Sequence, residues 1–398
     1  MAPQLFSPLQ IRGVTLKNRI AVSPMWQYQG RAGYPTDWHL MHLGRLADGG
    51  AALVMQEGTQ VQRDGCGTTG DLGIWSDEHV MPLRRLTDVM RGLGAVPGIQ
   101  LMHSGRKARM RRPMEGRVHL QRSPDIVDWD EWEPQAPSAL PLYEGAPPPR
   151  EMTLADIDRL THSFVDAARR ATSAGYEVIE LHAGHGYLLN QFLSPGSNQR
   201  TDSYGGSFRG RTRLVLEVAE AVRSIIPDEM PLFVRISAVD PTGWTMEDSV
   251  ALTRSLMQLG VDVIDCSSGG VGGAPTAGRG TSSTAAASNQ VYGSGYGYQV
   301  KYASELRQRT GARTMTVGLI VHPGQAQRIV EEGHADIVAL GRELLYNPNW
   351  PLDAAVKLGV PDPWALTNER TAYWLAKRAD TASGIVPSTF SSTDDPRM

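Results

Sequence analysis

The run YEVIELHAGHGY, residues 176–187, joins an apolar segment to a cluster of polar side chains. Its first half has the continuous apolar pattern of a short strand that is buried on both faces of a parallel sheet. His182, His185 and Tyr187 follow where that strand ends, on a turn that also contains two glycines. Two imidazoles and a phenol can bind a carbonyl oxygen and deliver a proton. The sequence therefore predicts a catalytic site at the C-terminal end of this strand.

Seven further segments have the same short apolar pattern. They are RIAVSPM (19–25), AALVMQEG (51–58), VPGIQLMH (96–103), LFVRISA (232–238), VDVIDCSS (261–268), RTMTVGL (313–319) and ADIVALGR (335–342). Helical patterns alternate with the strands, over residues 37–50, 78–94, 154–175, 211–226, 246–260, 298–311, 323–333 and 350–359. This alternation predicts an α/β protein, a (β/α)8 TIM barrel that forms one domain over residues 1–398. The alternative is a doubly wound open sheet, which needs a glycine-rich nucleotide loop after its first strand, and SPMWQYQGRAG (23–33) lacks that fingerprint.

Four segments stand outside the alternation. Residues 5–19, LFSPLQIRGVTLKNR, predict a short hairpin before the barrel. Residues 107–150 are rich in proline and tryptophan and follow the third strand, and we expect them to form a cap over the site. Residues 267–298 are rich in glycine, serine and alanine and should also emerge at the C-terminal face of the barrel. Residues 360–398 form a C-terminal extension.

Composition narrows the class of protein. The 398 residues include 39 Lys and Arg against 42 Asp and Glu, a formal net charge of -3, which argues against a nucleic-acid partner. The only cysteines, Cys66 and Cys266, are too few for a disulfide framework, a four-cysteine zinc site or a cysteine-ligated iron–sulfur cluster. No stretch of about 18 apolar residues and no secretion signal is present. We therefore predict a cytoplasmic protein with a small-molecule substrate and with no metal, nucleic-acid or membrane partner.

Polar groups at the other strand ends point to a cofactor. Amides, imidazoles and arginines gather there without a carboxylate cluster, which fits a flat heteroaromatic ring that carries a phosphate. Gly318, Gly341 and Arg342 follow the last two strands, the usual phosphate position of a TIM barrel. Arg235 lies within an apolar strand, where an unpaired charge is costly. Its partner is either a core carboxylate such as Glu180 or a reduced, anionic cofactor ring.

The same residues resemble the Old Yellow Enzyme family of FMN-dependent ene-reductases, in the thermophilic-like class that includes xenobiotic reductases. The resemblance extends from Leu5 to about Arg378. It is carried by SPMWQY (23–28), QEG (56–58), LGIWSDEH (72–79), IQLMHSGRKA (99–108), IELHAGHGYLLNQFLSPGSNQRTDSYGG (179–206), LFVRISA (232–238), IDCSSG (264–269) and ALGREL (339–344). The string HxxHGYL followed by SNxRxDxYGGS is the most specific of these signals.

The resemblance implies a TIM barrel that holds FMN non-covalently and is reduced by NAD(P)H. The flavin N5 hydride would pass to the β-carbon of an alkene conjugated to a carbonyl or nitro group. His182 and His185 would bind the activating oxygen, and Tyr187 would protonate the α-carbon. The expected FMN contacts are Ser23, Pro24, Met25, Trp26, Gln60, Gln100, Arg235, Gly318, Gly341 and Arg342. Tyr28 and Trp374 would contact substrate, the latter in its own or a neighbouring site, which implies a homodimer or homotetramer.

Two positions depart from the family pattern. Members of this class usually have cysteine at the position of Trp26 and a small residue at that of Gln60. Both substitutions put ordinary small-enone substrates in doubt. The alternatives are an FMN-dependent dehydrogenase, a reductase of nitro compounds or aromatic rings, or a flavin-binding protein in which Trp26 blocks turnover.

Overall fold

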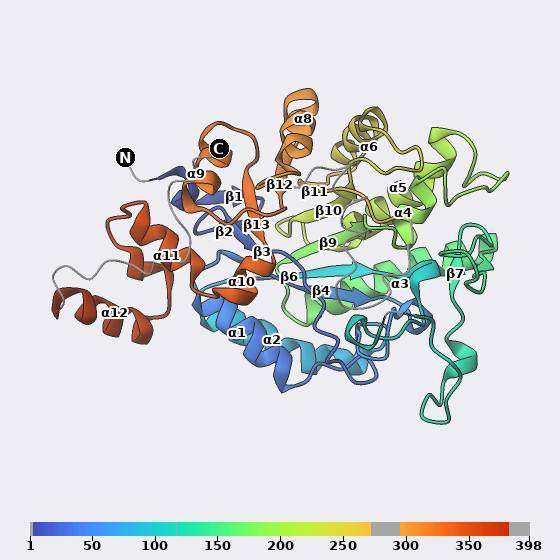
Figure 1. Cartoon of the computed structure of the whole chain (residues 1–398), viewed down its shortest axis with the longest axis horizontal. Helices are drawn as coiled ribbons and strands as arrows, with labels where there is room; N and C mark the ends of the chain where they lie inside the picture. Colours follow the sequence, from blue (N-terminus) through green and yellow to red (C-terminus); the bar gives the residue numbers. More distant parts are fainter. Residues whose placement is uncertain (1–2, 117, 272–294, 382–398) are drawn as a thin grey trace.

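Eight parallel strands of the computed structural model close into a barrel at the centre of the molecule (Figure 1). The structure describes residues 3–116, 118–271 and 295–381. The barrel strands are β3 (Ile20–Val22), β4 (Leu53–Gln60), β6 (Val96–Met102), β9 (Val178–Ala183), β10 (Leu232–Ser237), β11 (Val263–Ser267), β12 (Arg313–Thr316) and β13 (Ile337–Leu340). They pair in the order β3-β13-β12-β11-β10-β9-β6-β4, and the pairing of β3 with β4 closes the ring. Each overlaps a segment expected from the sequence, so the predicted TIM barrel is confirmed.

Helices cover the outside of the barrel (Figure 1). The predicted helices are α1 (Asp37–Asp48), α2 (Val80–Gly92), α3 (Leu154–Ser173), α5 (Phe208–Ile225), α6 (Met246–Gln258), α8 (Val300–Thr310), α9 (Pro323–Glu331) and α11 (Trp350–Lys357). The helix α3 begins as its sequence indicates, because the Thr153 hydroxyl accepts a hydrogen bond from the Asp156 N–H. The sequence did not predict α4 (Leu188–Leu193), α10 (Arg342–Tyr346) and α12 (Glu369–Thr381). None of the helices in the described ranges is long and apolar enough to cross a membrane.

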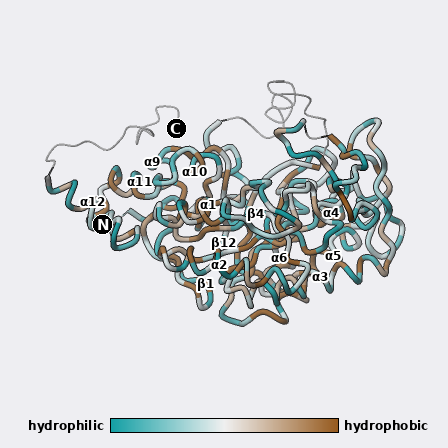
Figure 2. The backbone as a smooth tube through the Cα atoms, turned by 90° about the horizontal axis from the view of Figure 1, so that it is seen from below, coloured by the Kyte–Doolittle hydropathy of each residue, from teal (hydrophilic) through white to brown (hydrophobic). Residues whose placement is uncertain are grey.

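The predicted hairpin plugs the N-terminal end of the barrel. Its strands, β1 (Leu9–Ile11) and β2 (Val14–Leu16), pair antiparallel. Ile11 and Leu16 are buried in one apolar cluster with Phe233 and Met315 from the barrel strands. A larger apolar cluster fills the space between strands and helices, and in Figure 2 the apolar stretches run through the barrel wall. The N-terminal end is thus closed by packing, which leaves the opposite end for polar groups.

The insertion after β6 contains little regular structure. A two-residue strand, β7 (Gln135–Ala136), pairs with β8 (Arg150–Glu151), while β5 (Leu72–Gly73) extends β4. Trp132 anchors the insertion, because its indole N–H donates to the Cys66 carbonyl at 2.8 Å and the Arg63 guanidinium lies 4.2 Å from its ring centroid. Short 3-10 helices occur at Gln4–Phe6, Arg63–Gly65, Asp77–His79, Gly105–Lys107, Pro113–Glu115, Trp129–Glu131 and Pro363–Leu366. The role of the insertion as a cap stays a prediction. Of residues 267–298, the stretch 272–294 lies outside the described residues.

Candidate active site

The three side chains that follow β9 meet at the C-terminal end of the barrel. His182 Nε2 lies 3.3 Å from His185 Nδ1, and the ring centroids of His182 and Tyr187 are 5.0 Å apart. His185 has a left-handed backbone, with φ of 56°, and the Ser237 hydroxyl accepts its N–H at 2.8 Å. The structure therefore brings the predicted catalytic residues together, and a hydrogen bond from β10 holds the strained turn.

Both imidazoles are neutral in this environment. Burial lowers the pKa of His182, and the charges of His185, Arg235 and Lys107 lower it further. Burial, Arg235 and Lys107 likewise lower the pKa of His185. The Gly184 N–H donates to His182 Nδ1 at 3.4 Å, so His182 Nε2 carries the hydrogen and donates to His185 Nδ1. This order of donors leaves the Nε2–H of His185 to bind an oxygen.

Aromatic rings cover one side of this cluster. The Trp26 ring packs edge-on against Tyr187, with centroids 5.3 Å apart at an interplanar angle of 72°. Tyr28 packs against the other side of Trp26 at 5.6 Å and has a left-handed backbone, with φ of 56°. Lys107 Nζ lies 5.1 Å from the Tyr187 ring centroid and donates to the His185 carbonyl at 2.6 Å. The phenol of Tyr187 thus has a cation beside it, which sequence reasoning did not identify.

A cavity of about 390 Å³ opens next to His185. Arg235, Ser267 and Ser268 contribute polar groups to its wall. Its far end is formed by the segments after β12 and β13, and its residues there include Gly318, Gly341 and Arg342. Five residues predicted from the sequence as site residues therefore line one cavity: His185, Arg235, Gly318, Gly341 and Arg342.

Gly318 is required at its position by both backbone and space. Its φ is 119°, and a Cβ there would lie 2.7 Å from Gln299 Nε2 and 3.0 Å from the Tyr298 ring. Gly341 is less restricted, since a Cβ would meet only Met25, at 3.6 Å. The backbone can thus approach a bound group closely at Gly318, next to the charge of Arg342.

Arg235 has a different carboxylate partner from the one that the sequence suggested. Its Nε lies 3.0 Å from Asp265 Oδ2 on β11, and its Nη1 donates to the Ser23 hydroxyl at 3.2 Å. Glu180 instead accepts a hydrogen bond from Gln100 Nε2 at 2.7 Å. Burial and the charge of Asp265 raise the pKa of Glu180 to about 8, although Arg235 and Gln100 lower it. One guanidinium is therefore buried among two carboxyl groups, and Glu180 keeps its proton at neutral pH.

Gln60 does not face this cavity. Its amide nitrogen donates to Asp71 Oδ2 at 3.1 Å and to the Ser104 hydroxyl at 3.2 Å. The β4 residue next to the other site groups is Gly58, where a Cβ would lie 3.2 Å from Trp26 Nε1 and 3.3 Å from Gln100 Oε1. The register of β4 with β6 shifts between Gln56 and Thr59. This irregularity explains the difference, because it changes which residues of β4 point inward.

Trp374 lies away from the cavity of its own chain. Its side chain is 66% exposed on α12, beside Tyr373 and Lys377. Figures 1 and 2 both show α12 at one end of the molecule, apart from the barrel. A contact with substrate in a neighbouring subunit stays a prediction.

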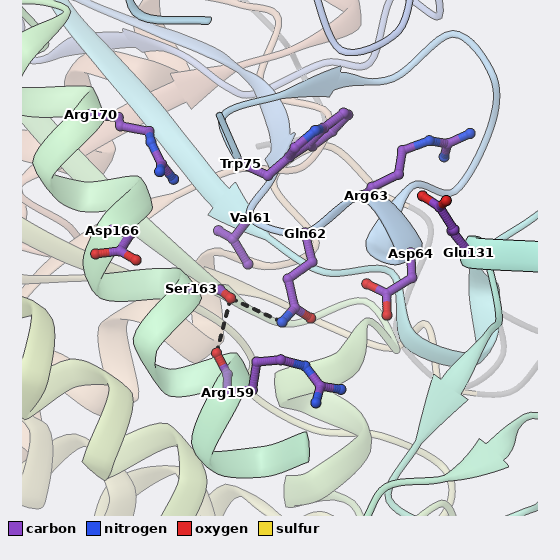
Figure 3. Close-up of a pocket in the computed structure, with 10 residues that line it drawn as sticks. All are labelled: Val61, Gln62, Arg63, Asp64, Trp75, Glu131, Arg159, Ser163, Asp166 and Arg170. Carbon is purple, nitrogen blue, oxygen red and sulfur yellow. Dashed lines mark hydrogen bonds between the residues drawn. The ribbon is translucent and has the colours of Figure 1, made fainter. Parts of the chain in front are cut away.

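A second hollow, of about 330 Å³, lies on the outside of the barrel between the end of β4 and α3 (Figure 3). Gln62 donates to the Ser163 hydroxyl at 3.0 Å across it. Its three arginines already have carboxylate partners, in the pairs Arg63–Asp128, Arg159–Asp156 and Arg170–Asp77. Charges that are already paired do not indicate a ligand, so we assign this hollow no binding role.

Known proteins share this sequence and architecture. A family model described as the NADH:flavin oxidoreductase / NADH oxidase family matches residues 4–360. An NADPH dehydrogenase of Geobacillus thermodenitrificans is 44% identical over 360 residues, which cover 89% of this chain and 95% of that protein. One from Geobacillus sp. strain WCH70 is 42% identical over 374 residues, covering 93% and 99%. A solved structure of morphinone reductase in complex with tetrahydroNAD matches with a TM-score of 0.71 and 26% identity, covering 93% of this chain and 94% of that one.

Proposed function

The chain belongs to the NADH:flavin oxidoreductase / NADH oxidase family and is an FMN-dependent NAD(P)H oxidoreductase, and we propose that it reduces a carbon–carbon double bond conjugated to a carbonyl or nitro group. The observation that carries this proposal is the grouping of His182, His185 and Tyr187 beside the cavity that Arg235 and Arg342 line. Such a grouping offers an oxygen-binding donor and a proton donor within one site.

The donors around the cavity suit FMN. Arg342 and the backbone beside Gly318 fit a phosphate, because a guanidinium gives a fixed charge and a glycine turn lets N–H groups approach. Arg235 is a buried cation on the cavity wall and fits the polar edge of the ring. When bound, FMN supplies the hydride chemistry, with NAD(P)H as the source of electrons.

The protein's own groups prepare the substrate. A neutral His185 donates its Nε2–H to the carbonyl or nitro oxygen and so draws electron density from the double bond. Tyr187 holds a proton on its hydroxyl and donates it to the α-carbon. Lys107, 5.1 Å from the ring centroid, stabilises the negative charge that this transfer leaves on the phenol. Trp26 packs on Tyr187, so flat substrates fit this side of the site better than bulky ones.

Anaerobic stopped-flow measurement of the two half-reactions tests the proposal. NADPH should reduce the bound flavin, and 2-cyclohexenone should reoxidise it. Tyr187→Phe should slow the second step by about 10²–10⁴-fold, the usual contribution of a general acid, and leave the first within a few-fold. Equal losses in both steps would refute the role of Tyr187. Flavin reduction without any reoxidation by the enone would favour another oxidised substrate, and a protein that takes up no FMN would refute the proposal.

A further inference from the structure

An irregularity in β4 lies directly behind the aromatic side of the site. Gln56 pairs with Ile99 and Thr59 with Leu101, so Glu57 and Gly58 fall between two paired positions. The Thr59 hydroxyl donates to the Glu57 carbonyl at 2.8 Å and accepts from the Gln56 amide at 2.9 Å. Such bulges are over-represented next to active sites, where they re-aim side chains.

The two residues of the bulge hold the segment that carries Trp26 and Tyr28. The Gly58 carbonyl accepts the indole N–H of Trp26 at 2.8 Å. Glu57 Oε2 accepts the backbone N–H of Gln27 at 2.8 Å, and the Tyr28 backbone also hydrogen-bonds to this carboxylate. The left-handed backbone of Tyr28 is strained for a residue with a Cβ, so it persists only where neighbours hold it. The bulge supplies those neighbours.

Glu57 is itself held by a residue of α1. Its side chain is 3% exposed, and Oε1 lies 3.3 Å from His39 Nε2. The Thr36 N–H donates to His39 Nδ1 at 2.9 Å, so Nδ1 carries no hydrogen and Nε2 does. Both oxygens of Glu57 therefore face donors. A buried carboxylate is costly without such partners, and here it has a donor on each side.

We propose that Glu57, oriented by His39, is a positioning residue that fixes Trp26 and Tyr28 against Tyr187 and thereby sets the shape of the substrate side of the site. The connection runs from the start of α1, through Thr36, His39 and Glu57, to the backbone of Gln27. It deepens the proposed function and rests on it for the effect on ligands, whereas the placement of Trp26 can be tested without turnover.

Three variants separate this role from general stability. Glu57→Gln keeps the shape but replaces one oxygen with an amide NH2, which must face either the Gln27 N–H or His39 Nε2–H, and both are donors. His39→Leu removes the support from the other side. His39→Gln is the matched control, because its amide oxygen can accept the Thr36 N–H, as in a capping box, while its NH2 donates to Glu57.

Two measurements on the FMN-loaded protein give the result. In protein labelled with 5-fluorotryptophan, the Trp26 resonance is identified by its loss in Trp26→Phe. Glu57→Gln and His39→Leu should shift or broaden that resonance, and His39→Gln should leave it in place. The Kd of p-hydroxybenzaldehyde, measured from the flavin absorbance, should rise about tenfold in the first two variants and less than about threefold in the control.

Several outcomes would overturn the inference. An unmoved Trp26 resonance with an unchanged Kd in Glu57→Gln contradicts it, even if the melting temperature falls. If Glu57→Gln does not fold, the His39 pair decides: a change in the leucine variant alone supports the role, and the same result in both variants refutes it. A failure of enone turnover with the expected change in the resonance would count against the proposed reaction and not against this positioning.

Discussion

Replacing Glu180 with glutamine should stabilise the protein at high pH and leave its stability at low pH nearly unchanged. Glu180 and Asp265 are both buried beside the single guanidinium of Arg235, and the pKa of Glu180 is raised from the usual 4.5 to about 8. Between these two values the folded protein binds more protons than the unfolded chain. The free energy of unfolding therefore falls by up to about 1.4 kcal/mol for each unit that pH rises, and stops falling above the folded pKa.

Glutamine has nearly the same shape but binds no proton. Its side-chain oxygen can still accept the hydrogen bond that Gln100 donates to Glu180 at 2.7 Å. At pH 5 both proteins have a neutral side chain at this position and should unfold at similar urea concentrations. At pH 8 the wild-type protein pays for a partly ionised Glu180, and the variant should be more stable by about 3 kcal/mol or more.

Urea denaturation followed by tryptophan fluorescence at pH 5, 6, 7 and 8 measures this difference. FMN is kept at the same saturating concentration for both proteins. Asp265→Asn is the informative comparison, because it also leaves one carboxyl group for one guanidinium but removes the 3.0 Å contact with Arg235. That variant should be less stable than Glu180→Gln at every pH. If the stability difference between Glu180→Gln and the wild-type protein stays within about 0.5 kcal/mol from pH 5 to pH 8, Glu180 does not titrate as the structure requires.

Three further outcomes concern ligands. Arg342→Ala should weaken FMN binding about 10–100-fold in a fluorescence titration, the range for a hydrogen bond to a charged group, whereas Arg313→Ala, at the other end of β12, should bind as the wild type does. Gly318→Ala should also raise the FMN Kd, by about tenfold, because its backbone has φ of 119° and its Cβ would overlap Gln299; unchanged binding would contradict the close approach there. Trp26→Ala removes the ring that packs on Tyr187 and should lower the KM of a bulky cyclic enone relative to that of 2-cyclohexenone about tenfold, and an equal change for both would argue against Trp26 as the limit on substrate shape.

The barrel could be predicted because its strands are short, apolar and bounded by turn residues. The segment VDVIDCSS (261–268) contains β11 (Val263–Ser267), and LFVRISA (232–238) contains β10 (Leu232–Ser237). The pairing of Arg235 with Asp265 was within reach of the sequence. Both residues interrupt apolar strands that are consecutive in the chain, and the parallel register puts them side by side. The sequence-based choice of Glu180 considered the strand on the other side of β10.

What the sequence did not predict depends on local backbone geometry and on distant packing. The register shift in β4 makes Gly58, and not Gln60, the neighbour of Trp26, and no residue pattern indicates such a bulge. The contact of Lys107 with the His185 carbonyl joins two loops that are 78 residues apart in the chain. Similarly, helix α12 has the expected aromatic residues, but its own chain does not bring Trp374 to the site.

The charge of Arg235 connects the barrel interior to the cavity. Asp265 neutralises this guanidinium at 3.0 Å, so the cavity wall stays free of net negative charge only while Glu180 keeps its proton. An anionic group in the cavity and a proton on Glu180 therefore favour each other, because each reduces the repulsion that the other state would meet. The same positive charges, Arg235 and Lys107, keep His182 and His185 neutral and able to donate. One buried guanidinium thus sets the protonation of groups on both sides of it, and this explains why a site built to stabilise negative charge contains two carboxyl groups in its floor.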